Sequence, residues 1–241
     1  MEVDIFIPCH ISELYPDIGF SMVKILEKLS VKCFYNANQS CCGQLCFNTG
    51  FWDETKNLGE KFIKDFSRGR MVVSPSASCV EMVNQNYPLM FKNSSLHNEL
   101  RTLQANIFEI TDFLVHKMNV SKLGAIFPHK VTIHDSCSRK INSLEEDNLR
   151  FLLKHVKGIE VVEMPESTSC CGFGGSFSIH NEAVSVSLAQ QKVENALSTG
   201  AEFIICTETT CMMHLQSYIN KNNLSIKTIH ITDVLAAGWE E

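Results

Sequence analysis

The chain repeats one cysteine pattern in its two halves. Four cysteines of the first half recur in the second half at offsets of 128, 129, 129 and 132 residues. The matched pairs are Cys9 and Cys137, Cys41 and Cys170, Cys42 and Cys171, and Cys79 and Cys211. Offsets this similar make chance a poor explanation, so we predict a tandem duplication. A duplication limits the possible folds to those in which one architecture occurs twice.

Short apolar runs alternate with helical patterns around the cysteines of both halves. Strands are predicted at three pairs of matching segments in the two halves: 5–9 and 131–137, 31–35 and 159–163, and 71–74 and 203–206. Helices are predicted at two such pairs: 18–29 and 144–156, and 54–66 and 183–197. This alternation is typical of α/β units with a parallel sheet. The runs 71–74 and 203–206 are largely apolar, as expected for strands covered on both faces. We therefore predict two similar Rossmann-like α/β domains, with the cysteine loops at the C-terminal edges of the strands.

The boundary between the halves is predicted near residue 122. The two domains would then cover residues 1–122 and 123–241, joined through the stretches 93–106 and 120–128. Each half closes on the string Ile-Thr-Asp-x-Leu, beginning at Ile110 and at Ile231. In both copies the Thr or the Asp is expected to cap a helix.

Composition restricts the classes of partner and the compartment. The net charge of −6 argues against a nucleic-acid or anionic-membrane surface, which would need clustered Lys and Arg. No run approaches the roughly 18–20 apolar residues of a membrane helix, so membrane insertion is not expected. The acidic start lacks the basic region of a signal peptide, which predicts a cytoplasmic protein. In a reducing compartment, eleven cysteines indicate metal binding or redox chemistry rather than disulfides.

The repeated cysteines fall at strand ends or in the loops that follow. Ligands bind at this edge of parallel α/β sheets because the loops converge there, so cysteines 31 to 36 residues apart can meet. Helices that begin after these loops direct backbone N–H groups toward the same region. Such donors stabilise an anionic iron–sulfur cluster held by thiolates. The pattern therefore predicts cluster binding in each half.

Glycines follow both double cysteines, at Gly43 and Gly172. Neighbouring side chains of a regular strand point to opposite faces, so two adjacent cysteines need a turn to face one ligand. A following glycine permits positive φ and a close approach of the backbone. The second copy continues with Gly174 and Gly175, which predicts a backbone wrapped tightly around a bulky cofactor. A phosphate-binding loop is the weaker interpretation, because the P-loop lysine and the dinucleotide spacing are absent.

Zinc is the main competing metal. Structural zinc sites usually have paired C-x(2–4)-C knuckles, and the closest spacings here are Cys42 to Cys46 and Cys206 to Cys211. Among the cysteines outside the repeat, Cys33 and Cys206 are expected to pack within strands, and Cys46 is a weaker candidate ligand. His134 and Asp135 are expected to serve a local turn or cap.

The order Cys, Cys-Cys-Gly, Cys resembles the CCG cysteine-rich domain of iron–sulfur proteins such as heterodisulfide reductase. The strings 41–44, 74–79 and 170–178 look most like the lactate utilization protein A type. The resemblance implies an iron–sulfur electron-transfer subunit of a complex that oxidises L-lactate to pyruvate. Its partners would be proteins of the lactate utilization protein B and C types. The implied ligands are Cys9, Cys41, Cys42 and Cys79 at one site and Cys137, Cys170, Cys171 and Cys211 at the other.

One departure from the family pattern bears on the chemistry. The fuller motif ends in C-x-x-C, but Met82 and His214 stand at the last position of the two copies. Four cysteines per site suffice for an ordinary [4Fe–4S] cluster, so up to two clusters are expected, with His214 as an additional or replacement ligand. The missing cysteine favours electron relay over disulfide cleavage.

Two alternatives stay open at this point. One is a thiol–disulfide redox protein like heterodisulfide reductase, and the other is a non-enzymatic metal-binding or redox-sensing module. The sequence has no flavin or nicotinamide fingerprint. Whether the chain is itself an enzyme is therefore open, and we expect an oxidoreductase component that acts with partner subunits.

Overall fold

The computed structural model describes residues 1–137 and 147–239. These residues form two compact units, the first from Met1 to Phe113 and the second beginning at Leu114. Each unit contains a four-stranded parallel sheet with helices packed against it, which confirms the predicted pair of similar α/β domains. The boundary near residue 122 stays a prediction, because a division by packing does not locate the end of a repeat.

The first sheet has the strand order β2-β1-β3-β4. Its strands are β1 (Glu2–Ile5), β2 (Lys32–Tyr35), β3 (Met71–Ser74) and β4 (Ile107–Glu109). All are parallel, with Val3 opposite Cys33 in β2 and Asp4 opposite Val72 in β3. The chain moves from β1 to one side of the sheet and returns to the other side of β1 as β3. Loops that leave β1 and β3 therefore flank a topological switch point, the usual ligand-binding place in such sheets.

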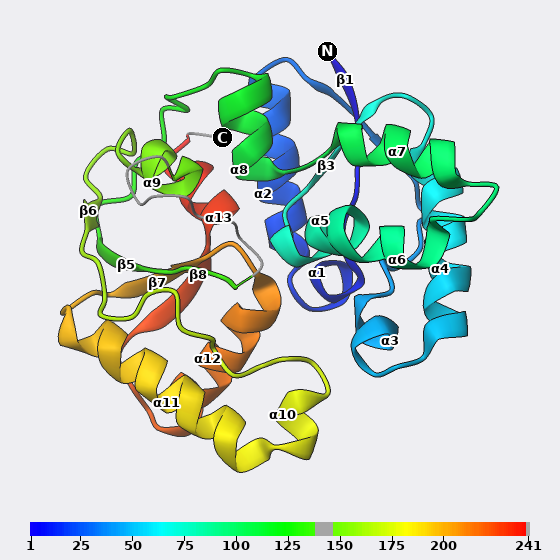
Figure 1. The fold of residues 1–241 in the computed structure, drawn as a ribbon. Coiled ribbons are helices and arrows are strands. Elements are labelled where there is room, and N and C mark those ends of the chain that lie inside the picture. The colour runs from blue at the N-terminus through cyan, green and yellow to red at the C-terminus, as the bar shows by residue number, and fades with distance from the viewer. Residues whose placement is uncertain (138–146, 240–241) are drawn as a thin grey trace. The chain divides into compact units, whose positions relative to one another are not determined.

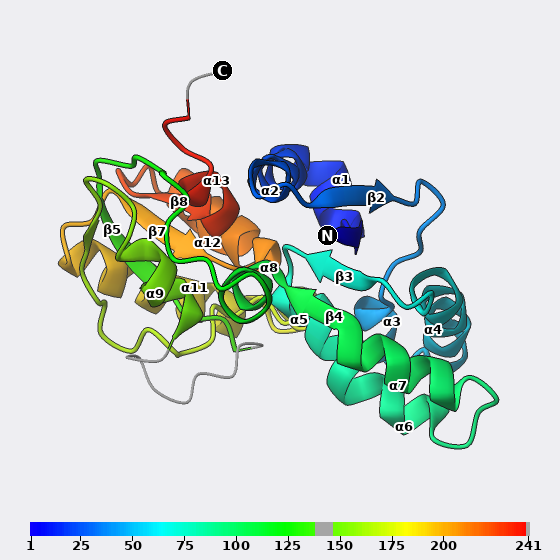
Figure 2. The same cartoon turned by 90° about the horizontal axis from the view of Figure 1, so that it is seen from above.

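Helices cover both faces of the first sheet. They are α1 (Cys9–Leu14), α2 (Pro16–Lys28), α3 (Gln44–Asn48), α4 (Trp52–Phe66), α5 (Ala77–Glu81), α6 (Tyr87–Phe91), α7 (His97–Asn106) and α8 (Ile110–Asp112), with a π-helical turn η1 (Met82–Asn86). A second π-helical turn, η2 (Phe113–Lys117), runs from the last residue of the first unit into the second unit. Figure 2 shows α2 on one face, and α4 and α7 pack together on the other. Helix α2 begins with Pro16, where a missing N–H costs little, and buries Ile18, Met22 and Ile25 along one stripe.

The second sheet repeats this topology as β6-β5-β7-β8. Its strands are β5 (Lys130–His134), β6 (Glu160–Val161), β7 (Phe203–Cys206) and β8 (Lys227–His230). The helices are α9 (Asn148–Leu153), α10 (Phe177–His180), α11 (Glu182–Ser198), α12 (Thr209–Lys221) and α13 (Ile231–Leu235). Helices α9 and α13 lie on one side of the sheet, and α11 and α12 lie on the other (Figure 1). The identical strand order is what a duplication produces.

Strands β3 and β7 have the predicted bounds, whereas other elements differ. Strand β1 ends at Ile5, before the predicted end at Cys9, because Pro8 has no N–H for the ladder and instead precedes α1. The stretch 93–106, predicted as a connection, contains α7, whose Leu100 and Leu103 are buried in the first core. Strands β4 and β8 were not predicted. Residues 144–146, which begin one predicted helix, lie outside the described residues.

The helices that begin with Ile-Thr-Asp are capped by the preceding residue. The backbone N–H of Thr111 donates to the Glu109 carboxylate at 2.9 Å, and that of Thr232 donates to His230 Nδ1 at 3.3 Å. The predicted cap by Thr or Asp is therefore wrong, since the threonine supplies the donor.

Each unit has its own apolar core. In the first, Phe6, Phe62 and Phe66 pack edge-to-face or tilted, with ring centroids 4.7 to 5.6 Å apart. In the second, Ile133 and Ile204 of the sheet are fully buried. None of the helices in the described ranges combines the length and hydrophobicity needed to span a bilayer.

Candidate metal centres

The first unit brings its four repeated cysteines together. Cys9 begins α1, the pair Cys41-Cys42 follows β2, and Cys79 lies in α5 after β3. The Sγ atoms of Cys9 and Cys41 are 3.5 Å apart, and those of Cys42 and Cys79 are 3.2 Å apart. Hydrogen bonds from the thiol of Cys42 and then that of Cys9 hold the pKa of Cys41 well below its usual range. Four thiols from three loops therefore form one contact group, which we call the first thiol group.

The second unit forms an equivalent arrangement, the second thiol group. The Cys171 thiol donates to Cys211 Sγ at 3.0 Å. Hydrogen bonds from Cys137 and then from Cys171 lower the pKa of Cys170, so all four predicted cysteines again meet. In each group an inner pair is buried, Cys42 with Cys79 and Cys171 with Cys211, and the outer cysteines are exposed or half-buried. None of the eleven cysteines, all within the described ranges, forms a disulfide.

Backbone donors also face the thiols. The N–H of Gly43 donates to Cys41 Sγ at 3.4 Å, and the N–H of Gly172 donates to Cys170 Sγ at 3.3 Å. Both glycines have positive φ, 81° and 92°, as predicted for the turn after the double cysteine. Gly174 and Gly175 also have positive φ and form the turn into α10. Their contact with a cofactor stays a prediction.

The two turns differ in how closely a helix approaches them. A Cβ on Gly172 would lie 2.5 Å from the Ser185 carbonyl oxygen and 2.9 Å from Leu188 Cβ of α11. A Cβ on Gly43 would have its nearest neighbour at 3.5 Å, the Thr55 side chain, which is ordinary van der Waals contact. Only the second turn is therefore closed to a side chain by packing.

The thiols of each group compete for protons. Hydrogen bonding to Cys41 and Cys79, together with burial, raises the pKa of Cys42 well above its usual value. Hydrogen bonding from Cys171, opposed by burial, lowers the pKa of Cys211 to about 6. Close thiolates repel one another, so all four can ionise together only beside a cation. A group of four thiols with N–H donors to sulfur therefore fits a metal or an iron–sulfur cluster.

His134 is a residue that the sequence interpretation undervalued. It is the last residue of β5, is 1% exposed, and makes no well-aligned hydrogen bond at either ring nitrogen among the described residues. One of its nitrogens and the Sγ atoms of Cys171 and Cys211 all lie within 4.8 Å of one another. The expected turn or capping role is therefore wrong. The available signal was the repeat itself, because Phe6 occupies the matching position in the first half.

Asp135 also has a role other than capping. Its two carboxylate oxygens accept from Nη1 and Nη2 of Arg150 at 2.9 and 2.8 Å. Arg150 also pairs with Asp147 at 2.9 Å and with Glu163 at 2.7 Å. Burial disfavours the charge, but hydrogen bonds with Glu163 and Asp135 raise the pKa of Arg150 above its usual value. This buried arginine, which the sequence did not single out, holds the chain just before Cys137 against α9.

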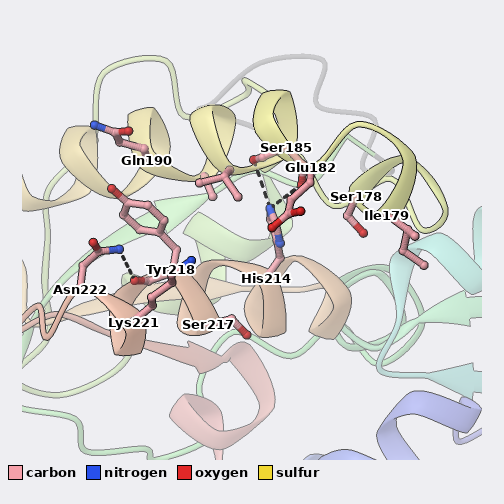
Figure 3. Close-up of a pocket in the computed structure, with 12 residues that line it drawn as sticks. Ser178, Ile179, Glu182, Ser185, Gln190, His214, Ser217, Tyr218, Lys221 and Asn222 are labelled. Atoms are coloured by element: carbon pink, nitrogen blue, oxygen red, sulfur yellow. Dashed lines mark hydrogen bonds between the residues drawn. The ribbon is translucent and has the colours of Figure 1, made fainter.

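His214 lies in a pocket rather than at the second thiol group. The pocket has a volume of about 650 Å³ and is formed by residues of α10, α11 and α12 (Figure 3). His214 points from α12 toward α11, where its Nε2 is 3.1 Å from Ser185 Oγ and 3.3 Å from the Ser185 carbonyl oxygen. Among the described residues, the histidine grouped with Cys171 and Cys211 is His134. Cys46 is half-buried within α3.

Two parallel α/β units, each with four thiols at the C-terminal ends of its strands, define a class of cysteine-rich proteins. Comparison with protein families matches two segments, residues 3–84 and 131–216, to the CCG cysteine-rich domain. The chain belongs to this CCG cysteine-rich domain family. The matched segments contain all eight repeated cysteines.

Individual relatives extend the similarity over nearly the full length. The chain is 36% identical over 237 residues to lactate utilization protein A 1 of Bacillus mycoides, covering 98% of this chain and 96% of the relative. It is 36% identical to lactate utilization protein A of Oceanobacillus iheyensis, with the same two coverages, and 32% identical to that of Bacillus subtilis, covering 98% and 99%.

A solved structure supports the fold alone. A hypothetical protein from Helicobacter pylori superposes with a TM-score of 0.61 at 13% identity over the full chain. The chain spans about half of that protein, 49% of its length.

Proposed function

We propose that the chain is an iron–sulfur electron-transfer subunit acting in the oxidation of L-lactate to pyruvate. The observation that carries the proposal is the pair of four-thiol groups, each assembled from three loops at one sheet edge. The first centre would be held by Cys9, Cys41, Cys42 and Cys79. The second would be held by Cys137, Cys170, Cys171 and Cys211.

The donor set supports a [4Fe–4S] cluster in each half. Such a cluster needs four ligands, and each group supplies four thiols without a further cysteine. The chain contributes the thiolates, the N–H donors of Gly43 and Gly172, and burial of the inner cysteines. A bound cluster would supply one-electron transfer.

Lactate enters the proposal through the relatives, which are called lactate utilization protein A. The chain carries no flavin or nicotinamide motif, so the step on lactate itself is assigned to partner proteins of the B and C types. In this division of labour the chain receives and passes on electrons, and the expected place of the complex is the cytoplasm. If the purified chain alone oxidised L-lactate with an artificial acceptor, the division would be wrong.

Metal and sulfide analysis of anaerobically purified protein tests the proposal. We expect Cys41→Ser and Cys170→Ser each to lose about half of the iron and acid-labile sulfide, because each removes one ligand of one centre. Cys33→Ser is a matched control outside the thiol groups and should keep both in full. Zinc without iron or sulfide in the unmodified chain would contradict the proposal. Steady turnover of a disulfide substrate would favour heterodisulfide-type chemistry instead.

A further inference from the structure

His134 is a buried imidazole, 1% exposed, and a polar group that it faces is the thiol of Cys211. Among the described residues, neither ring nitrogen makes a well-aligned hydrogen bond. A buried polar group that lacks good hydrogen bonds destabilises the folded state. The position at the end of β5 does not require histidine, because Phe6 occupies it in the first half. The fold of the second unit alone therefore does not explain why His134 is buried at this position.

The inner sulfur atoms lie beside this imidazole. A ring nitrogen of His134 and the Sγ atoms of Cys171 and Cys211 form one buried set within 4.8 Å. An N–H donor next to a thiolate sulfur makes a charge-assisted hydrogen bond. The imidazole is thus placed to interact with a metal-bound sulfur.

The first thiol group has a different environment at this position. Phe6 packs edge-to-face on Phe62 with ring centroids 4.8 Å apart and offers no donor. An imidazole elsewhere in that unit, His10, follows Cys9 on α1, is half-buried, and interacts electrostatically with the outer Cys41. Among the described residues, the inner pair of the first group has no counterpart of His134.

Since four thiols already supply the ligands, we propose that His134 is a positioning and tuning residue rather than a ligand. It donates an N–H to Cys211 Sγ of the loaded second centre and raises the reduction potential of that centre. The reason is that N–H donors to cluster sulfur stabilise the more negative reduced state. This inference rests on the proposed function, because it requires a cluster at the second thiol group.

The test uses full-length chain with Cys41→Ser, in which only the second centre remains. An EPR-monitored redox titration of this protein is compared with His134→Phe and His134→Gln in the same background. Phe reproduces the first-half residue without a donor, whereas Gln keeps an N–H. We expect Phe to shift the reduction equilibrium at least tenfold toward the oxidised form, which is about 59 mV for a one-electron couple. Gln should restore most of this shift.

Three outcomes separate this inference from the proposed function. Absence of iron and sulfide from Cys41→Ser protein would sink the proposed function itself. Full iron content with the same potential in His134→Phe would overturn the tuning role alone. A strong ¹⁴N coupling in pulsed EPR, showing imidazole bound directly to iron, would also overturn it. A weak ¹⁴N coupling that disappears in the Phe variant is the expected result.

Discussion

At the scale of single residues, two glycines with the same local sequence carry different constraints. Gly43 and Gly172 both follow Cys-Cys, both have positive φ, and both donate to the first cysteine of the pair. The sequence predicted the turn, because chain geometry demands it. It could not predict that α11 crowds Gly172, because that depends on how a helix packs after folding. The position of the His134 imidazole beside Cys171 and Cys211 could not be predicted for the same reason.

Alanine at these two positions should separate backbone strain from crowding. Gly43→Ala forces a side chain into positive φ only, and we expect a loss of about 1–2 kcal/mol in the free energy of unfolding. Gly172→Ala adds the clash with the Ser185 carbonyl, so the loss should rise by about 1–3 kcal/mol more. Urea unfolding of the metal-free chain measures both. Equal losses would show that α11 can shift away without cost.

At the scale of secondary-structure elements, the sequence predicts those elements whose burial shows as a run of consecutive apolar residues. Strands β3 and β7 were located because both are largely apolar. Strands β4 and β8 contain charged or polar residues, and their identity comes from pairing with β3 and β7 rather than from their own pattern. The ion pairs of Arg150 in α9 reach Asp135, just after β5, and Glu163, just after β6. Such pairing is visible only after folding.

Replacing Arg150 with Met should destabilise the second unit strongly. The change removes the guanidinium that pairs with the buried carboxylates of Asp135 and Asp147, and removing one member of a buried ion pair costs about 3–5 kcal/mol. The matched control is Lys32→Met, which breaks an exposed ion pair with Glu2 and should cost about 0–1 kcal/mol. Chemical unfolding measures both losses. A loss below 1 kcal/mol for the Arg150 variant would mean that the carboxylates become protonated or hydrated.

At the scale of the whole molecule, duplication explains most of what the sequence could predict. The four offsets indicated the repeat, and the repeat in turn predicted two parallel sheets and two thiol groups. The structure shows that the two copies have diverged in the details, with Phe6 and His134 as the clearest example. A matched position reveals that two residues differ but not which atoms they face, so this asymmetry was beyond sequence reasoning.

Loading with iron and sulfide should stabilise the chain against heat. A cofactor that binds only the folded state at 100 times its Kd adds about 2.7 kcal/mol, or about 5–10 °C in Tm for a chain of this size. We expect this rise after anaerobic reconstitution, measured by circular dichroism. The double variant Cys41→Ser with Cys170→Ser provides the control and should show little change. An equal rise in that variant would mean that iron binds elsewhere.

Each thiol group contains buried and more exposed cysteines, and this difference determines which thiols are oxidised first in air. Dissolved oxidants meet Cys9, Cys137 and Cys170 first, because these side chains are exposed, whereas Cys42, Cys79, Cys171 and Cys211 are buried. Oxidation of cysteine follows access as well as thiolate character. Oxidation in each half should therefore begin at the outer cysteines, while the inner pair remains reduced. A protein that loses its outer thiols first keeps, in each half, a pair of sulfur atoms around which repair can begin.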